Sequence, residues 1–375
     1  MWSAVPDAPN NFIDTFEAKY PNIKVNVNSI TEGDYSQKIN TMVASGTAPE
    51  VMLLWECDIP KMAKAGKIDK LDDYIANSQD VKADDFIPAV GKLNTQNGAC
   101  YGLPWCVATE ICYYNKDMFD AAHLAYPKDD WTQSEMLADA QKLTVSKNGT
   151  TSQWGMASPN FVGIWYANIG ATGDNILDAN NQLALGSGAT KSLQFMSDLV
   201  NKYKVMPAPS ADTTTDLFAA GKAAIFETGS WMISSYKDAA FHWDIVPLPK
   251  DQRQYASLHT GFYAINAKSK HKDADWTFIN YMMSSDGQKV VEAGSANPSA
   301  KLSMQDDTSW QVKGKNGPTN WQAVTDSLKF SVFGYVLSNP GATSNAQKYF
   351  QQVAAGTLSA QDAVNKSNED AKTMS

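Results

Sequence analysis

Residues 49–55 read PEVMLLW, an apolar run in which hydrophobic and polar side chains do not alternate. Such a run is typical of a central strand that is covered on both faces, so helices must lie on both sides of its sheet. Apolar residues recur at intervals of three and four over residues 10–20 and 34–44, which predicts helices, and residues 23–27 alternate as a half-buried strand does. This order predicts α/β architecture, with mixed, mostly parallel sheets flanked by helices.

The same alternation continues through the rest of the chain. We expect further strands at residues 110–115, 223–226, 243–246 and 262–266, and further helices at residues 60–66, 190–203, 272–283, 286–293 and 343–355. Thr132 and Glu135 form a capping box that opens another helix, and residues 359–362 cap the last one. A length of 375 residues favours two domains or lobes over one compact core.

The composition narrows the classes of ligand. Hydrophobic residues make up 43% of the chain and charged residues 19%, and no apolar run approaches the ~20 residues that cross a bilayer, so we expect a folded, soluble protein. A net charge of -9 disfavours nucleic acid, and Arg253 is the one arginine that could clamp an anion. The 11 Trp and 15 Tyr residues supply flat amphipathic surfaces, which suit neutral, hydroxyl-rich ligands.

The cysteines and histidines show no metal-binding pattern. Cys57, Cys100, Cys106 and Cys112 lack the paired spacing of zinc sites, and the four histidines are scattered, so we expect no metal and no cofactor. In an exported protein the four cysteines allow three disulfide connectivities, and free buried thiols are an equal expectation. No recognisable leader precedes the first helix, which leaves a cytoplasmic protein and an exported one with its leader removed as alternatives.

Catalytic signatures are absent, whereas aromatic residues stand at the ends of predicted strands. The sequence contains no G-x-S-x-G elbow, P-loop, G-x-G-x-x-G after a strand, H-E-x-x-H or EF-hand loop. A glycosidase is still possible, because its chemistry needs only two suitably spaced carboxylates. Trp55, Trp105, Trp231 and Tyr263 lie at or beyond strand ends, where open α/β sheets bind their ligands.

Polar and small neighbours make two of these tryptophans candidates for sugar binding. Trp55 precedes Glu56 and Asp58, whose carboxylates can hold sugar hydroxyls, although a Trp that closes a sheet edge is an equal interpretation. Trp231 follows a Gly-Ser pair, where small residues let a ligand approach closely. In a loop-rich stretch we expect exposure of Trp165 and Tyr166. Packing roles are expected for Trp131, Trp243 and Trp276.

Motifs spread over the whole chain resemble one family. They are TAPEV at residues 47–51, YGLPW at 101–105, YYNKDMF at 113–119, GKAAI at 221–225, GSW at 229–231, GFYAIN at 261–266, SSDGQ at 284–288 and GTLSAQDA at 356–363. In this order the motifs resemble the extracellular solute-binding proteins of carbohydrate ABC importers, a family that includes the maltodextrin-binding proteins. The resemblance runs from Trp2 to about Lys372.

The resemblance implies a two-lobed, periplasmic-binding-protein-like fold with a ligand cleft between the lobes. Lobe 1 would comprise residues 1–106 and 263–312, and lobe 2 residues 111–256 and 316–375, with hinge crossings at residues 107–110, 257–262 and 313–315. The implied function is a receptor of an ABC transporter that captures a neutral sugar, preferably an oligosaccharide, by lobe closure. It would deliver this sugar to the membrane permease subunits.

Carried over position by position, the resemblance also implies ligand-binding residues in both lobes. Lobe 1 would contribute the loop of residues 2–7 with Asp7, and then Glu32, Tyr35, Trp55, Glu56, Asp58 and Trp105. Lobe 2 would contribute Asn160, Phe161, Trp165, Trp231 and Phe333 or Tyr335. The matching segment at 261–266 adds Gly261, Phe262 and Tyr263.

The sequence departs from the family pattern at two places. The first strand is nearly missing, because the sequence starts at its terminal Trp2. Where the maltodextrin binders have a Glu shortly after the Leu-Pro segment, Ala108 stands here, and the nearest acid is Glu110. Maltose itself is therefore not the expected ligand.

The resulting prediction is a monomeric, non-enzymatic bacterial sugar receptor outside the cytoplasm, either a cell-surface lipoprotein or a periplasmic protein. Within the binding class, the alternative ligand is a cationic solute such as a polyamine, held by carboxylates against aromatic faces. The alternative from another class is a carbohydrate-active hydrolase with the same aromatic cleft.

Overall fold

The chain divides into two compact units. The computed structural model describes residues 8–30, 35–179, 182–209, 216–333 and 340–373. Unit 1 comprises Met1–Ala108 and His259–Val312, and unit 2 comprises Thr109–Leu258 and Lys313–Ser375. The three points where the chain passes between units lie in or beside the segments expected as hinges, and their hinge role stays a prediction. Among the helices of the described residues, none has the length and apolar character needed to span a bilayer.

Unit 1 consists of short strands and surrounding helices. Its helices are α1 (Ala8–Lys19), α2 (Tyr35–Ser45), α3 (Asp58–Lys64), α4 (Asp72–Ala76), α5 (Pro88–Gly91), α11 (Lys272–Met283), α12 (Ser285–Ser295) and the 3-10 helix η3 (Leu302–Met304). Its strands are β1 (Val51–Trp55), β2 (Thr95–Gln96), β3 (Ala99–Cys100), β4 (Leu103–Pro104) and β11 (Gly261–Ile265). The apolar periods at residues 10–20 and 34–44 thus predicted α1 and α2 correctly.

In the described part of unit 1, a three-stranded sheet has the order β1-β11-β4, and β2 and β3 form a second, two-stranded sheet; all these pairs are antiparallel. β1 is buried in its middle, as its apolar run predicts, but it lies at the edge of this sheet and not in the centre of a parallel one. Residues 23–27 form no strand in the structure, so that prediction was wrong. A period of two shows that a segment can pair, but pairing also needs a neighbouring strand in register.

Unit 2 is the larger unit and contains the longer strands. Its helices are α6 (Lys116–Ala121), α7 (Gln133–Leu143), α8 (Val162–Ala171), α9 (Ser187–Asn201), the 3-10 helix η2 (Ser230–Met232), α10 (Ile233–Tyr236), α13 (Gln322–Phe330), α14 (Pro340–Ala354) and α15 (Ala360–Thr373). Its strands are β5 (Ala108–Asn115), β6 (Val145–Lys147), β7 (Thr150–Ala157), β8 (Ala223–Gly229), β9 (Trp243–Pro247), β10 (Ala256–His259) and β12 (Ser331–Val332). The predicted capping box is present, because Thr132 and Glu135 cap α7 reciprocally.

In the described part of unit 2, seven strands form a sheet with the order β12-β10-β5-β8-β7-β6, and β9 pairs with β5 off this path. β5 is antiparallel to both β8 and β9, whereas β7–β8 and β10–β12 are parallel. The sheets are therefore mixed, as predicted, but not mostly parallel. Burial on both faces tells that a strand is covered, and it carries no information on the direction of its neighbours.

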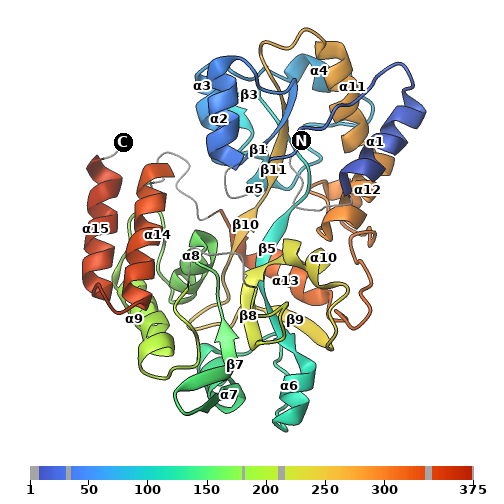
Figure 1. Cartoon of the computed structure of the whole chain (residues 1–375). Coiled ribbons are helices and arrows are strands. Elements are labelled where there is room, and N and C mark those ends of the chain that lie inside the picture. The colour runs from blue at the N-terminus through green and yellow to red at the C-terminus, as the bar shows by residue number, and fades with distance from the viewer. Residues whose placement is uncertain (1–7, 31–34, 180–181, 210–215, 334–339, 374–375) are drawn as a thin grey trace. The chain divides into compact units, whose positions relative to one another are not determined.

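Helices and strands of unit 2 share one hydrophobic core. α9, α14 and α15 pack against one another, with α14 and α15 side by side (Figure 1). α8 is buried along its whole length, so Trp165 is 1% exposed and Tyr166 is not exposed at all. The expected exposure of these two residues was wrong, because the stretch is an apolar core helix and not a loop. Trp131 and Trp243 are buried, as predicted.

Candidate functional site

In unit 1, aromatic rings gather at the end of β1. Trp55 is half-buried, and its ring centroid lies 6.1 Å from that of Tyr35 in an edge-to-face arrangement. The Tyr35 hydroxyl donates to the backbone carbonyl of Leu53 at 2.5 Å, and burial raises the pKa of this hydroxyl. Tyr35 therefore packs edge-to-face with Trp55, and Trp55 stays partly exposed.

Trp105 is a second half-buried tryptophan, and its backbone is bonded to the strand that pairs with β1. Its backbone N–H donates to the carbonyl of Gly261 at 3.0 Å, and Gly261 is the residue that pairs with Trp55 in the β1–β11 register. The next two residues of β11, Phe262 and Tyr263, are at most 1% exposed. Of the three predicted residues in this segment, only the glycine lies between the two tryptophans, and the other two are core residues.

Two carboxylates follow Trp55, and their surroundings differ. Glu56 and Asp58 are each 6% exposed. Asp58 accepts a hydrogen bond from Ser36 Oγ at 3.2 Å; burial raises the pKa of its carboxyl, and contacts with Ser36 and Asn40 oppose that rise. Glu56 accepts no hydrogen bond from any described residue, and its one partner there is His259, whose Nδ1 lies 3.8 Å from Glu56 Oε1.

His259 is a residue that the sequence did not identify. It ends β10 and stands far from Glu56 along the chain, so no motif or spacing connects the two side chains. Only the antiparallel pairing of β11 with β1 brings the start of unit 1's second segment beside the end of β1.

In unit 2, Trp231 and Phe161 form an aromatic pair. Their ring centroids lie 5.7 Å apart at an interplanar angle of 90°, and both residues are half-buried. Trp231 lies in η2, just beyond the end of β8. Its ring lies against Gly229. A Cβ built at Gly229 would lie only 2.1 Å from Trp231 Cζ3, so this ring position requires glycine.

Asn160 adds a polar group beside this pair. Trp165 Nε1 donates to Asn160 Oδ1 at 3.2 Å, and Gln347 Nε2 donates to the Asn160 carbonyl at 2.6 Å. Asn160 itself is half-buried. Trp165 therefore supports Asn160 from the core of unit 2, and its own ring, at 1% exposure, is not a surface for a ligand.

The remaining predicted residues are placed as follows. Phe333 is half-buried and follows β12. Asp7, Glu32 and Tyr335 lie outside the described residues, as does the loop of residues 2–7.

The acid nearest to the Leu-Pro segment is part of the core. Glu110 is fully buried in β5, where its carboxylate accepts a hydrogen bond from the Ser257 N–H. Glu227 on the adjacent strand β8 is 1% exposed. These two carboxylates lie in the interior of unit 2 and are closed to a sugar in this structure.

The described residues contain no group of three or more His, Cys, Asp or Glu side chains that could hold a metal ion. All four cysteines are free thiols in the structure. Cys106 and Cys112 are buried, and burial raises the pKa of both thiols. Burial also raises the pKa of Cys100, to about 11.

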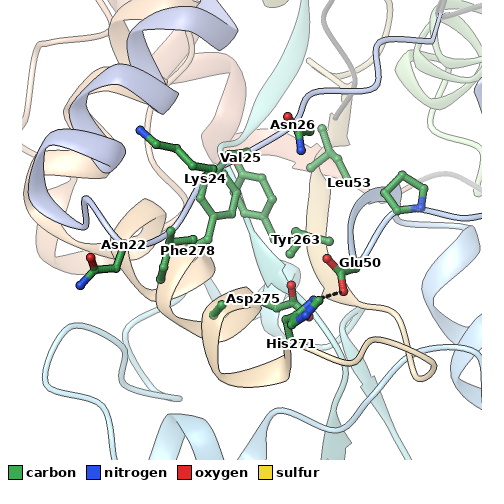
Figure 2. Close-up of a pocket in the computed structure, with 14 residues that line it drawn as sticks. Asn22, Lys24, Val25, Asn26, Glu50, Leu53, Tyr263, His271, Asp275 and Phe278 are labelled. Atoms are coloured by element: carbon green, nitrogen blue, oxygen red, sulfur yellow. Dashed lines mark hydrogen bonds and ion pairs between the residues drawn. The ribbon is translucent and has the colours of Figure 1, made fainter.

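A separate cavity in unit 1 lies between residues 22–26, β1 and α11 (Figure 2). Leu53, Tyr263 and Phe278 provide its apolar lining, and His271 and Glu50 form an ion pair at its rim, with Nδ1 2.8 Å from Oε1. Among the described lining residues, Tyr263 is the one predicted site residue. The cavity is thus distinct from the cluster around Trp55 and Trp105.

Comparison with known proteins identifies the family of the chain. Residues 11–323 match the family described as bacterial extracellular solute-binding protein. The maltotriose-binding protein of Pyrococcus abyssi is 28% identical over 261 residues, which cover 66% of this chain and 53% of that protein. A maltooligosaccharide ABC transporter solute-binding lipoprotein of Streptococcus pneumoniae is 22% identical over 258 residues, which cover 66% of this chain and 58% of that protein.

Among solved structures, the ABC substrate-binding protein from Listeria monocytogenes in complex with cycloalternan has a TM-score of 0.89 and 25% sequence identity. The alignment covers 100% of this chain and 97% of that protein. The fold is therefore shared over the whole length.

Proposed function

Because the chain belongs to the family of bacterial extracellular solute-binding proteins, we propose that it is a non-enzymatic receptor for a neutral sugar. One observation carries this proposal: each unit presents half-buried aromatic rings beside polar groups. Unit 1 has Trp55 and Trp105 next to Glu56, and unit 2 has Trp231 and Phe161 next to Asn160. Aromatic rings cover the apolar faces of sugar rings, while carboxylates and amides bind hydroxyls.

The names of the relatives refine the ligand class. They describe proteins that bind maltotriose, maltooligosaccharides and cycloalternan, which supports an oligosaccharide as the ligand of this chain. We place the receptor outside the cytoplasm, as a monomer that delivers the sugar to the permease subunits of an ABC transporter. Ligand contacts in both units would shift the protein towards its closed state, because only differential affinity moves such an equilibrium.

Burial of the acid pair in unit 2 favours a receptor over a hydrolase. Glu110 and Glu227 are at most 1% exposed, so neither can reach a glycosidic bond in this structure. A polyamine is disfavoured because several carboxylates must surround its ammonium groups, whereas the Asp58 carboxylate near Trp55 is already hydrogen-bonded to Ser36.

The test is titration calorimetry together with tryptophan fluorescence. Maltotriose, cycloalternan and smaller neutral sugars form the panel, with spermidine and amino acids as controls and product chromatography after overnight incubation. We expect saturable binding of one sugar class with a Kd of about 1 μM or lower, near -8 kcal/mol, and no products. Hydrolysis of a sugar, or binding of spermidine alone, would reject the proposal.

Tryptophan variants locate the binding. Trp55→Ala and Trp231→Ala should each weaken sugar binding at least about tenfold, since buried aromatic anchors dominate such interfaces. Trp276→Ala is the matched control, because Trp276 is half-buried on α11, where its ring stacks on Tyr74 at 5.2 Å. Equal losses in all three variants would point to a general effect on folding.

A further inference from the structure

Gln288 is a buried amide that joins two sequence motifs far apart in the chain. It is the last residue of the SSDGQ motif, lies on α12 and is fully buried. Its Nε2 donates at 3.2 Å to the carbonyl of Trp105, the last residue of the YGLPW motif. The same nitrogen donates to the Met282 carbonyl at 2.8 Å, and the Ser299 hydroxyl donates to Gln288 Oε1. A buried side chain of unit 1 thus binds the backbone of a tryptophan at the candidate site.

The partners of this side chain select a glutamine. A glutamine amide has two N–H donors on its nitrogen and an acceptor oxygen. Here the nitrogen faces two backbone carbonyls, which only accept, and the oxygen faces a hydroxyl, which donates. A carboxylate at this position would oppose both carbonyls, and an apolar side chain of the same length would lose both bonds. Because a buried polar group without a partner is costly, the surroundings fix both the residue type and its orientation.

The backbone around the Trp105 carbonyl is held on both sides. The Trp105 N–H donates to a carbonyl of β11 at 3.0 Å, and the Val107 N–H donates to the Pro298 carbonyl at 2.9 Å. Pro298 directly precedes Ser299, whose hydroxyl binds Gln288. These bonds close a ring of contacts through the buried backbone, and Gln288 links that ring to α12.

We propose that Gln288 is the positioning residue of Trp105 and holds it in place for contact with a sugar ring. This inference rests on the proposed function, and it adds a residue that is itself buried away from the sugar. A side chain that must be ordered during binding lowers the affinity, whereas one that is fixed beforehand avoids that cost. The precision of a binding site depends on such supporting hydrogen bonds behind the residues that touch the ligand.

The experiment measures sugar affinity by calorimetry in the full chain. The probes are maltotriose, cycloalternan and the smaller neutral sugars of the same panel. Gln288→Met keeps the length of the side chain without its hydrogen bonds, and we expect about three- to thirtyfold weaker binding, at most the loss in Trp105→Ala. Gln288→Glu keeps the acceptor oxygen but loses both donors, so it should weaken binding in the same range.

Asn94→Leu is the matched control. Asn94 is 4% exposed, and its Nδ2 donates at 2.8 Å to the carbonyl of Gly102, which belongs to the same motif as Trp105. The pairing of β4 with β11 lies between Gly102 and Trp105. Loss of this buried bond should lower the melting temperature, while sugar affinity stays within about twofold of the wild type.

Two further readouts separate positioning from a general effect on folding. In the Trp105→Ala background, Gln288→Met should change sugar affinity by less than about twofold, because the ring through which it acts is missing. Hydrogen exchange, followed by mass spectrometry without any sugar, reports on the backbone directly. We expect exchange at residues 105–107 to be at least about tenfold faster in Gln288→Met than in the wild type.

Three results would overturn the inference. Wild-type affinity in Gln288→Met would show that the bond to the Trp105 carbonyl does not support sugar binding. Equal losses from Gln288→Met in the wild-type and Trp105→Ala backgrounds would show that it acts elsewhere in the fold. Unchanged exchange at residues 105–107 would show that it does not hold this backbone. If the wild type binds no sugar at all, the proposed function fails, and the exchange measurement still decides whether Gln288 holds Trp105.

Discussion

The buried carboxyl of Glu227 should make the stability of unit 2 depend on pH. Glu227 Oε2 accepts a hydrogen bond from Asn168 Nδ2 at 3.3 Å, and Oε1 has no hydrogen-bond partner. Burial raises the pKa of Glu227 from its usual 4.5 to about 7; the Asn168 hydrogen bond opposes the rise, and the Glu110 carboxylate adds to it. Between these two pH values the folded protein keeps a proton that the unfolded chain has released.

The sign and size follow from this difference in proton binding. Since the folded pKa is raised, the contribution to stability is complete below pH 4.5 and is lost as the pH rises to about 7. A shift of about 2.5 pH units corresponds to about 3 kcal/mol of unfolding free energy. The Glu227→Gln variant cannot titrate at this position and should lack that part of the pH dependence.

The assay is urea denaturation from pH 4.5 to 8, followed by circular dichroism and fluorescence. We expect the wild type to lose about 3 kcal/mol relative to Glu227→Gln across this range. Glu369→Gln on α15 is the matched control, because Glu369 is exposed in the same unit. A wild-type-minus-variant difference that stays constant within about 1 kcal/mol would refute a raised pKa for Glu227.

Three further predictions concern close packing and thiols. Gly229→Ala should weaken sugar binding, measured by calorimetry, about tenfold or more. The new Cβ would lie 2.1 Å from the Trp231 ring and displace this aromatic side chain. Unchanged affinity would mean that the Trp231 ring does not contact the ligand. Gly155→Ala should lower the free energy of unfolding in urea by about 2 kcal/mol or more, since its Cβ would lie 1.9 Å from the Ala140 carbonyl oxygen. In the control Gly91→Ala the new Cβ has open space around it, so the free energy of unfolding should stay nearly unchanged. Cys106 and Cys112 should react with Ellman's reagent only on unfolding, because both thiols are buried and burial raises their pKa. A reductant should leave the melting temperature of the protein unchanged. A clear drop in melting temperature on reduction would show a disulfide.

Local patterns predicted most elements of this fold. The helix periods located α1, α2, α9, α11 and α14, and the capping box located the start of α7. The ordered motifs identified the family and the two-lobed fold class, and the family match and the shared fold confirm both. These features succeed because a repeat of three to four residues, or a cap at a helix end, is encoded within a few neighbouring positions.

Three tryptophans of the candidate site stand where the sequence placed them, and their role in ligand binding stays a prediction. Trp55, Trp105 and Trp231 stand at strand ends with half-buried rings, as their positions in the sequence indicated. Trp165 and Tyr263 were also selected, but they pack in the cores of their units. An aromatic residue after a strand has the same local sequence whether its ring faces solvent or the interior, so only packing distinguishes the two cases.

The sequence by itself determined the class of elements, the family and the aromatic and acidic residues from which a sugar site can be made. Tertiary structure decided which strands pair, and it made the sheets mostly antiparallel although the apolar run at β1 suggested parallel neighbours. It also placed His259 beside Glu56, two residues that no spacing connects. The physical reason is that periodicity reports how a segment is buried, whereas the partner that buries it is chosen by contacts between segments far apart in the chain.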